Sequence, residues 1–393
     1  MDNYSCAISP EDFSPEFQFL LTCCRPTPST EHIELQDKLI HFIQFEELCQ
    51  LAKRHKVVPL LNINLKRFQY LLPTEIQSWL NSAVEQNKQK IFRTLETIAL
   101  LKKSGYADDL LLLKGLEAAL VCYQDISIRD VGDIDILVDK SKLKDVAHTL
   151  KINGWEADPF HDEIIQSPML QKHHKDVTFS KPGYPRLELH WRTHLDVVEF
   201  HLSKIEKKAS NETFFSKPLP VEEHLIYLSV HGGMHAWWRL KWLFDIPNLI
   251  KSKQINWEKL WEKAYQAKAN LYVQEVLLLS KHLCGLHLNA EMMRGFEETN
   301  LNYSWRLTKE LLTLPESALI HLPAKIVLQL SFNNFWRINK IKAIFRFILY
   351  YLRPNVRDTQ SVSISSKIHF LYFVVRPFSL LIRMFKRLLR PTF

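Results

Sequence analysis

Segments with β-strand character are confined to residues 110–195 of this 393-residue chain, and long helical patterns occupy the sequence on both sides of them. Short alternating runs bounded by turn residues predict strands, whereas apolar residues recurring every three or four positions predict helices. The sheet must therefore be small. We expect an α+β fold in which a small mixed β-sheet is flanked by helical N-terminal and C-terminal regions.

Four regions are predicted from these patterns. They are a helical N-terminal region at 1–107, an α/β core at 108–200, a second helical domain at 201–331 and a basic, apolar C-terminal tail at 332–393. Ser14 followed by Pro15 is a typical helix start, and "KPGYP" (181–185) is a typical turn between two strands.

The cysteines and the first residues indicate the cellular compartment. None of the six cysteines forms a C-x-x-C motif, and the acidic N-terminal stretch has no apolar signal core. No uninterrupted apolar run reaches the roughly 18 residues that a membrane-spanning helix needs. We expect a reduced, cytoplasmic protein.

The tail carries most of the positive charge. Residues 332–393 hold 12 lysines and arginines and a single acidic residue, among many aromatic and aliphatic side chains. This composition is typical of an amphipathic helix that lies peripherally on the anionic inner face of a membrane. A helical layer packed on the body, with its cations reaching solvent, is an equal alternative. Nucleic-acid binding is less favoured, because aliphatic runs contribute little to phosphate binding.

The stretch "IRDVGDIDILVD" (128–139) places two aspartates at the start of an apolar strand. Alternate side chains of a strand share a face, so Asp133 and Asp135 point one way while Ile134 and Ile136 enter the core. Neighbouring carboxylates repel unless a cation lies between them. Mg²⁺, or the similar Mn²⁺, prefers oxygen ligands and would fit this pair.

A second strand, "RLELHW" (186–191), repeats the design, with Glu188 and His190 on the face opposite the aliphatic residues. If the two strands lie in one sheet, Glu188 joins the aspartates as a third oxygen donor. Three carboxylates on one face suit two-metal phosphoryl transfer. His190 is a weaker candidate for the same site.

Three further residues lie where phosphates could be bound. Lys114 and Gly115 come where a strand meets a helix, so a cation and backbone N–H groups are available there, and Arg129 precedes the aspartates by four positions. In the alternative interpretation Lys114 is only solvated and Arg129 pairs with Asp125 or Asp130.

The helical segment after the sheet contains further candidates. His231 and His235 are one helical turn apart, a spacing that can bind Zn²⁺, but no third ligand has a matching spacing. They are interpreted as packing residues or as residues that line a nucleotide site. Arg239 and Lys241 follow, either as phosphate contacts or as solvated cations of an amphipathic helix.

Together, "LLLKG-x13-R-x3-DIDILV", "LELHW" and "HGGMHAWWRLKWLFDI" resemble bacterial nucleotidyltransferases of the DNA polymerase β superfamily, in particular the branch described as uncharacterised. The similarity extends from "LAKRHKVVPLLNINLKR" (51–67) to about residue 285. It implies that Asp133 and Asp135 are the metal-binding pair and that Glu188 is the third carboxylate, which acts as or near the general base.

The same resemblance implies a nucleotide cleft closed by the helical domain, with Arg239 or Lys241 on the triphosphate. Lys114-Gly115 falls where such enzymes have a Gly-Ser turn, and "KGL" departs from that pattern. The expected reaction is Mg²⁺-dependent transfer of a nucleoside monophosphate from an NTP such as ATP to a hydroxyl or phosphate acceptor, by analogy in a surface-polysaccharide or modified-peptide pathway. A toxin-like enzyme acting on tRNA and a catalytically inactive nucleotide-binding scaffold are the alternatives.

Overall fold

The structure, a computed structural model, describes most of the chain. The described residues are 8–157, 159–172, 174–193, 214–215, 218–320, 322–338, 352, 358, 362 and 364–388. The predicted boundary between the core and the second helical domain, at 200/201, lies outside the described residues, as does about half of the predicted tail.

A five-stranded mixed sheet forms the centre of the α/β core, in the order β1-β2-β5-β4-β3. Strands β2 and β5 are parallel, and the other three neighbouring pairs are antiparallel. The strands are β1 (Leu110–Leu112), β2 (Ile134–Val138), β3 (Glu156–Ala157), β4 (Asp176–Ser180) and β5 (Leu187–His190). The expected α+β fold with a small mixed sheet is confirmed.

Helices precede and follow the sheet in the sequence, and several lie between its strands. Those before and within the core are η1 (Pro10–Asp12), α1 (Pro15–Thr22), α2 (Thr30–Leu39), α3 (Phe45–His55), α4 (Val58–Leu65), η2 (Lys66–Leu71), α5 (Thr74–Leu101), the π-helical turn η3 (Lys102–Tyr106), α6 (Leu116–Tyr123), η4 (Lys140–Lys142), α7 (Leu143–Ile152), α8 (Pro159–Gln166) and α9 (Pro168–Gln171). Those after it are α10 (Val221–Met234), α11 (Leu240–Ser252), α12 (Trp257–Gln266), α13 (Asn270–Cys284), α14 (Ala290–Met293), α15 (Asn302–Thr313), α16 (Glu316–Ile320), α17 (Ala324–Ile338), η6 (Ser366–Leu371) and α20 (Tyr372–Leu388).

One face of the sheet is covered by α5, α7 and α8. Ile134 and Ile136 of β2 and Leu187 and Leu189 of β5 pack there with apolar residues of these helices, as the alternation of the two strands predicts. Leu137, on the opposite face, belongs to a second and larger core that the helical parts supply. The polar residues of β2 and β5 therefore lie between the sheet and the helical body.

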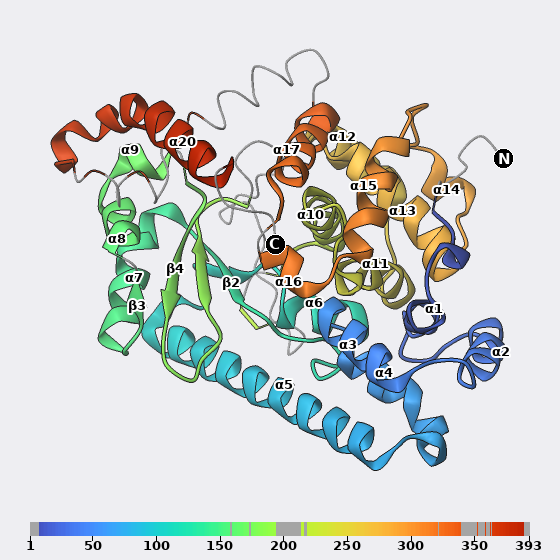
Figure 1. Cartoon of the computed structure of the whole chain (residues 1–393). Coiled ribbons are helices and arrows are strands. Elements are labelled where there is room, and N and C mark those ends of the chain that lie inside the picture. The colour runs from blue at the N-terminus through green and yellow to red at the C-terminus, as the bar shows by residue number, and fades with distance from the viewer. Residues whose placement is uncertain are drawn as a thin grey trace.

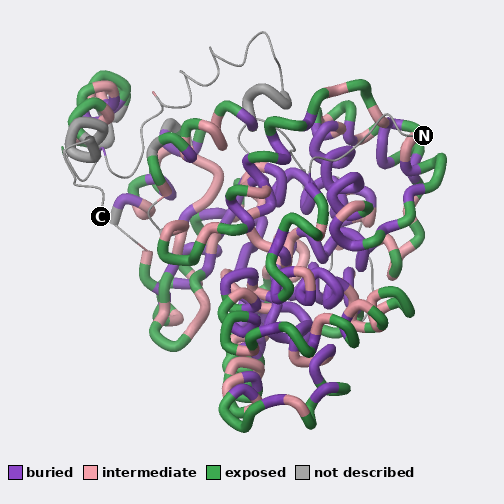
Figure 2. The backbone as a smooth tube through the Cα atoms, turned by 45° about the vertical axis from the view of Figure 1, so that its right-hand side comes forward, coloured by how far each residue is buried: buried purple, intermediate pink, exposed green. Residues whose placement is uncertain are grey.

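The N-terminal helices and the helices after the sheet share that larger core. Residues of α1, α3 and α4 pack in it with residues of α10, α11 and α13, and polar contacts join the same parts: the Asn248 side chain donates to the Cys24 carbonyl at 2.6 Å. Helix α5 links both cores, since its first half packs in the helical body and its second half under the sheet (Figure 1). Figure 2 shows the buried residues gathered in the interior of the molecule, with exposed residues along its outer turns and helices.

A sharp break separates α10 from α11, where the sequence pattern is helical throughout. Ala236 and Trp237 have positive φ angles of 45° and 53°, in the left-handed region that side chains disfavour. The Trp237 ring folds back onto α10, where a Cβ at Gly232 would come within 2.1 Å of it. Glycine at 232 therefore makes room for this ring, and the ring N–H donates to Glu275 at 3.0 Å.

Within the described ranges, no helix combines sufficient length with sufficient apolar character to cross a membrane.

Candidate active site

The parallel pairing of β2 and β5 places Asp135 directly beside Glu188. Lys114, from the corner between β1 and α6, reaches Asp135 with 3.0 Å between Nζ and Oδ1. His190 completes the group, because its Nε2 lies 3.4 Å from Asp135 Oδ1 and 3.4 Å from Glu188 Oε2. Asp135 thus lies beside three residues that were predicted separately from the sequence: Lys114, Glu188 and His190.

Strand β4 adds a carboxylate that sequence reasoning missed. Asp176 is the register partner of His190, and its Oδ2 lies 3.5 Å from His190 Nδ1. Lys175 forms an ion pair with Asp176. The signal was available, because counting outward through the "KPGYP" turn of a β4–β5 hairpin places Asp176 opposite His190.

Asp133 lies at the rim of the site, one residue before β2 begins. Its side chain is 40% exposed, whereas that of Asp135 is 2% exposed. Arg186 was not among the predicted residues. Its Nη2 lies 3.7 Å from Asp133 Oδ2 and 3.3 Å from Glu188 Oε1. The two carboxylates at the mouth therefore share one arginine.

In this site each acidic side chain has a basic side chain as a neighbour. Burial opposes ionisation of Asp135, but the Lys114 ammonium and His190 hold its pKa below the usual range. Burial also opposes charging of His190, and Lys175 adds to this, yet hydrogen bonds to Asp135 and Glu188 and the charge of Asp176 raise its pKa. At Asp133, burial and the neighbouring Asp135 raise the pKa. Asp135 is the carboxylate most strongly held as an anion.

The donor set of this site fits a divalent cation. Asp135, Glu188 and His190 each offer a ligand atom, and these atoms lie within 4.8 Å of one another. Carboxylate oxygens are the ligands that Mg²⁺ and Mn²⁺ prefer, and imidazole is a ligand for transition metals. Among the residues that the structure describes, these three form the one cluster of acidic, histidine or cysteine side chains whose ligand atoms lie close enough to share a metal ion.

Gly115 and Lys241, at the starts of two different helices, lie close to the loop that leads into β2. Gly115 caps the start of α6 with a positive φ of 67°, and a Cβ there would lie 3.5 Å from the Asp133 carbonyl oxygen. At the start of α11, Lys241 Nζ lies 3.8 Å from the point where Gly132 would carry a Cβ. The Lys241 ammonium therefore lies close to the loop that leads into β2.

Several neighbours set the pKa of Lys241. Burial, with Arg129 and Lys114 as nearby cations, lowers that pKa to about 7, against the opposing effect of Asp130 and Asp245. The Lys241 ammonium can therefore lose its proton near neutral pH.

Arg129 is placed differently from the predicted alternatives. It is 3% exposed, and its guanidinium donates to both carboxylate oxygens of Asp245 on α11 over 2.8–3.1 Å. A longer bond of 3.4 Å reaches the Gly115 carbonyl. The Asn87 side chain, on α5, donates to the Arg129 carbonyl and accepts from the Val131 N–H, so it holds the backbone on both sides of residue 130. Arg129 thus ties the loop before β2 to the helical body.

Arg239 contacts the helical body as well. Its guanidinium donates to the Arg54 carbonyl at 2.6 Å and to Glu316 at 2.9 Å. No contact between Arg239 and the carboxylates of the site is present among the described residues.

His231 and His235 belong to an aromatic cluster with Trp238 and Trp242. The His235 ring stacks on Trp242 at 5.1 Å, Trp238 stacks on Trp242 at 6.1 Å, and His231 meets both His235 and Trp242 edge-on at 5.1 Å. Burial, followed by the cations Lys114 and Lys175, lowers the pKa of His235 to about 3. The His235 ring therefore lies near Lys114 and Lys175 of the carboxylate site.

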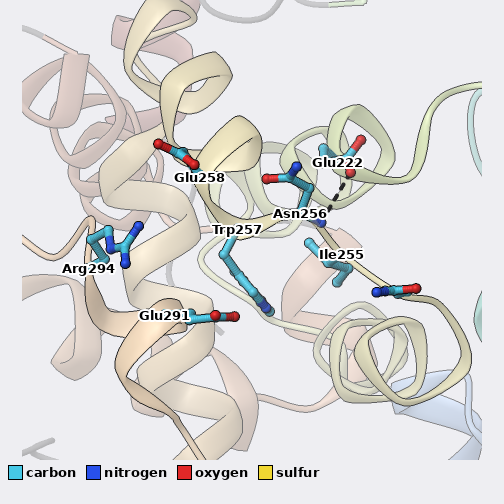
Figure 3. A pocket seen from close by; sticks show the side chains of 8 residues that line it. Glu222, Ile255, Asn256, Trp257, Glu258, Glu291 and Arg294 are labelled. Carbon is cyan, nitrogen blue, oxygen red and sulfur yellow. Dashed lines mark hydrogen bonds between the residues drawn. The ribbon is translucent and has the colours of Figure 1, made fainter.

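A separate pocket of about 410 Å³ opens in the helical body, around the start of α12 (Figure 3). It is lined mainly by polar side chains, and Glu222 at its edge accepts a hydrogen bond from the Asn256 backbone N–H at 3.3 Å. The lining residues are Glu222, Gln254, Ile255, Asn256, Trp257, Glu258, Glu291 and Arg294. None of the predicted site residues contributes to it.

One comparison with known proteins finds a match. A family described as "uncharacterised nucleotidyltransferase" matches residues 42–285, a range that includes the sheet, the carboxylates and the α10–α11 corner. The chain belongs to this nucleotidyltransferase family. No curated protein and no solved structure matches it.

The buried Arg129–Asp245 pair yields a stability prediction. Arg129→Met leaves Asp245 buried without its cation, so the free energy of unfolding should fall by about 3–5 kcal/mol. Urea unfolding followed by circular dichroism measures it. Arg93→Met is the control, because the Arg93–Glu96 pair is exposed and its loss should change the free energy of unfolding far less. Equal losses in the two variants would contradict the assigned role of Arg129.

Proposed function

We propose that this protein transfers a nucleoside monophosphate from an NTP to a hydroxyl or phosphate acceptor, with Mg²⁺ or Mn²⁺ as cofactor. The observation that carries the proposal is the pairing of Asp135 with Glu188 on adjacent strands, with Asp133 at the same edge and cations around them. The acceptor oxygen would form a bond to the α-phosphorus, and the bond from that phosphorus to the β-phosphate oxygen would break. Pyrophosphate leaves.

Asp133, Asp135 and Glu188 would hold the metal ions, with His190 beside them. Bound there, Mg²⁺ or Mn²⁺ would neutralise the triphosphate and the charge that develops on the departing pyrophosphate. Glu188 is 19% exposed, more than Asp135, and lies at the face where an acceptor would enter. We assign to Glu188 the acceptance of the acceptor's proton.

Lys114, Lys241 and the start of α6 at Gly115 would bind the triphosphate. The two lysines come from opposite sides of the loop before β2, and backbone N–H groups of a helix start favour anions. Arg129 would act through its bonds to Gly115 and Asp245, by fixing α6 and α11 relative to each other. For Arg239 we propose a comparable positioning role at the start of α11, through Arg54 and Glu316.

The aromatic cluster would bind the nucleobase. Trp238 and Trp242 are half-buried and stacked, and Trp242 is adjacent in sequence to Lys241. A base that stacks on Trp242 would leave its phosphates close to Lys241. Stacking tolerates every base, since each has a π face, so this surface favours affinity more than base selection. His231 and His235 would support the tryptophans by packing against Trp242.

The acceptor class can be found directly. We propose incubating the protein with each α-labelled NTP, Mg²⁺ and a cell lysate that is afterwards separated into RNA, protein, lipid and small molecules. The fraction that gains label identifies the acceptor. Label in RNA would favour a toxin-like enzyme acting on tRNA, and label in none would favour a nucleotide-binding scaffold.

Removing either aspartate should abolish transfer. Asp135→Asn and Asp133→Asn should each lower kcat at least about thousandfold, because the site loses the charge that holds the metal ions. Incorporation of α-labelled NTP into the acceptor fraction measures it. Asp37→Asn is the control, since Asp37 is exposed and pairs with Arg67. Full activity in both site variants would remove these residues from the mechanism.

The pKa of Lys241, near 7, predicts a pH dependence of NTP binding. Below that pH Lys241 is already protonated and affinity should be constant. Above it, binding must include uptake of a proton, so affinity should fall by up to about tenfold per pH unit. Calorimetry between about pH 6 and 8.5 tests this against Lys241→Arg, whose guanidinium stays charged over the whole range. The same fall in Lys241→Arg would show that another group titrates.

The proposed base stacking predicts that a substitution of Trp242 changes KM for the NTP much more than kcat. Trp242→Ala should raise KM for the NTP by about tenfold to a hundredfold, because one stacking contact is lost, with little change in kcat. Trp242→Phe should retain most of the affinity. Trp79→Ala removes another half-buried tryptophan, on α5, and should leave KM unchanged. A fall in kcat alone would argue against base stacking.

A further inference from the structure

Helix α20 is amphipathic in the reverse sense to a surface helix of a globular protein. Surface helices turn apolar residues toward the core and polar residues toward solvent. Over its described side chains, 372–382, α20 buries Tyr372, Arg376 and Ser379 and exposes several large apolar residues. The helix lies at the edge of the molecule, beyond α8 and α9 (Figure 1).

The inward face of α20 is held by buried polar contacts. Arg376 forms an ion pair with the buried Asp358 at 3.3 Å, and Ser379 donates a hydrogen bond to the same carboxylate. Tyr372 is 1% exposed, and its hydroxyl donates to the Val362 carbonyl at 3.1 Å. These contacts, at positions 372, 376 and 379, join one side of α20 to tail residues 358 and 362 and leave the opposite side facing outward.

The outward face carries aromatic and aliphatic side chains at helical spacing. Their exposed fractions are 58% for Phe370, 59% for Val374, 64% for Phe378, 62% for Leu381 and 56% for Ile382. The last four are separated by four, three and one positions, so they form one stripe along α20. An apolar stripe of this size is unfavourable in water and is typical of a surface that is covered by a partner.

The charge of this part of the chain indicates the partner. Residues 332–393 contain 12 lysines and arginines, and Asp358, their only acidic residue, is buried against Arg376. A second copy of the chain would bring two cationic segments together, which is unfavourable. Nucleic acid would find few hydrogen-bond donors along the apolar stripe. An anionic lipid surface satisfies both features, because its acyl region accepts apolar side chains and its headgroups attract cations.

We propose that α20 lies in the surface of an anionic lipid bilayer, with the stripe of Val374, Phe378, Leu381 and Ile382, and with Phe370 of η6 just before it, inserted among the acyl chains. Its opposite face stays bound to the tail segment that precedes it, through the contacts of Arg376 and Ser379 with Asp358 and of Tyr372 with Val362. This inference does not depend on the reaction proposed above.

Vesicle flotation of the full-length protein tests the proposal. The protein should float with vesicles that contain phosphatidylglycerol, and much less with vesicles of phosphatidylcholine alone. Phe378→Glu combined with Leu381→Glu should lower the bound fraction at least about tenfold, because two charges would enter the acyl region. Added salt should weaken binding by the unaltered protein.

A matched control changes two other exposed phenylalanines. Phe42 and Phe92 are 73% and 58% exposed and lie outside α20, so Phe42→Glu combined with Phe92→Glu should bind vesicles as the unaltered protein does. All the altered side chains are exposed, and unchanged thermal unfolding would verify that each variant is folded. Absence of flotation by the unaltered protein, or equal flotation by the α20 variant, would overturn the proposal. A self-association that the α20 variant abolishes, without flotation, would overturn it in favour of a second copy.

Discussion

The parallel pairing of β2 with β5 is the interaction on which the rest of the site depends. Parallel neighbours cannot be joined by a tight turn, so the chain between them must leave the sheet and return. Here it forms α7, α8, β3 and β4 on the way. That excursion brings Asp135 beside Glu188 and covers one sheet face with apolar helices. The opposite face is left for the carboxylates.

The helical body turns this sheet face into an enclosed site. The Arg129–Asp245 pair joins the loop before β2 to α11, and α11 brings Lys241 toward the same loop. A buried ion pair contributes little net stability, because desolvation offsets the attraction. Its geometric effect is larger, since bidentate bonds fix the angle as well as the distance between the two parts. Carboxylates from the sheet and a cation from α11 are thus kept close together.

Much of the sheet was predictable from the sequence because strand alternation fixes which side chains share a face. The positions of Asp135, Glu188 and His190 follow from that rule together with one parallel pairing. The partner of Arg129 was not predictable in this way, since Asp245 lies on a distant helix and Asp125 and Asp130 were nearer in sequence. The break between α10 and α11 was missed for a related reason. Its left-handed residues, Ala236 and Trp237, carry no local turn signal, and the contact that holds them is tertiary.

The packing of Trp237 on Gly232 has an evolutionary consequence. Position 232 can accept a side chain only if position 237 first loses its large ring, because the two would occupy the same space. The two positions are therefore not free to drift independently. A lineage that kept the tryptophan would also keep glycine at position 232, and with it the corner that places His235 near Lys114 and Lys175.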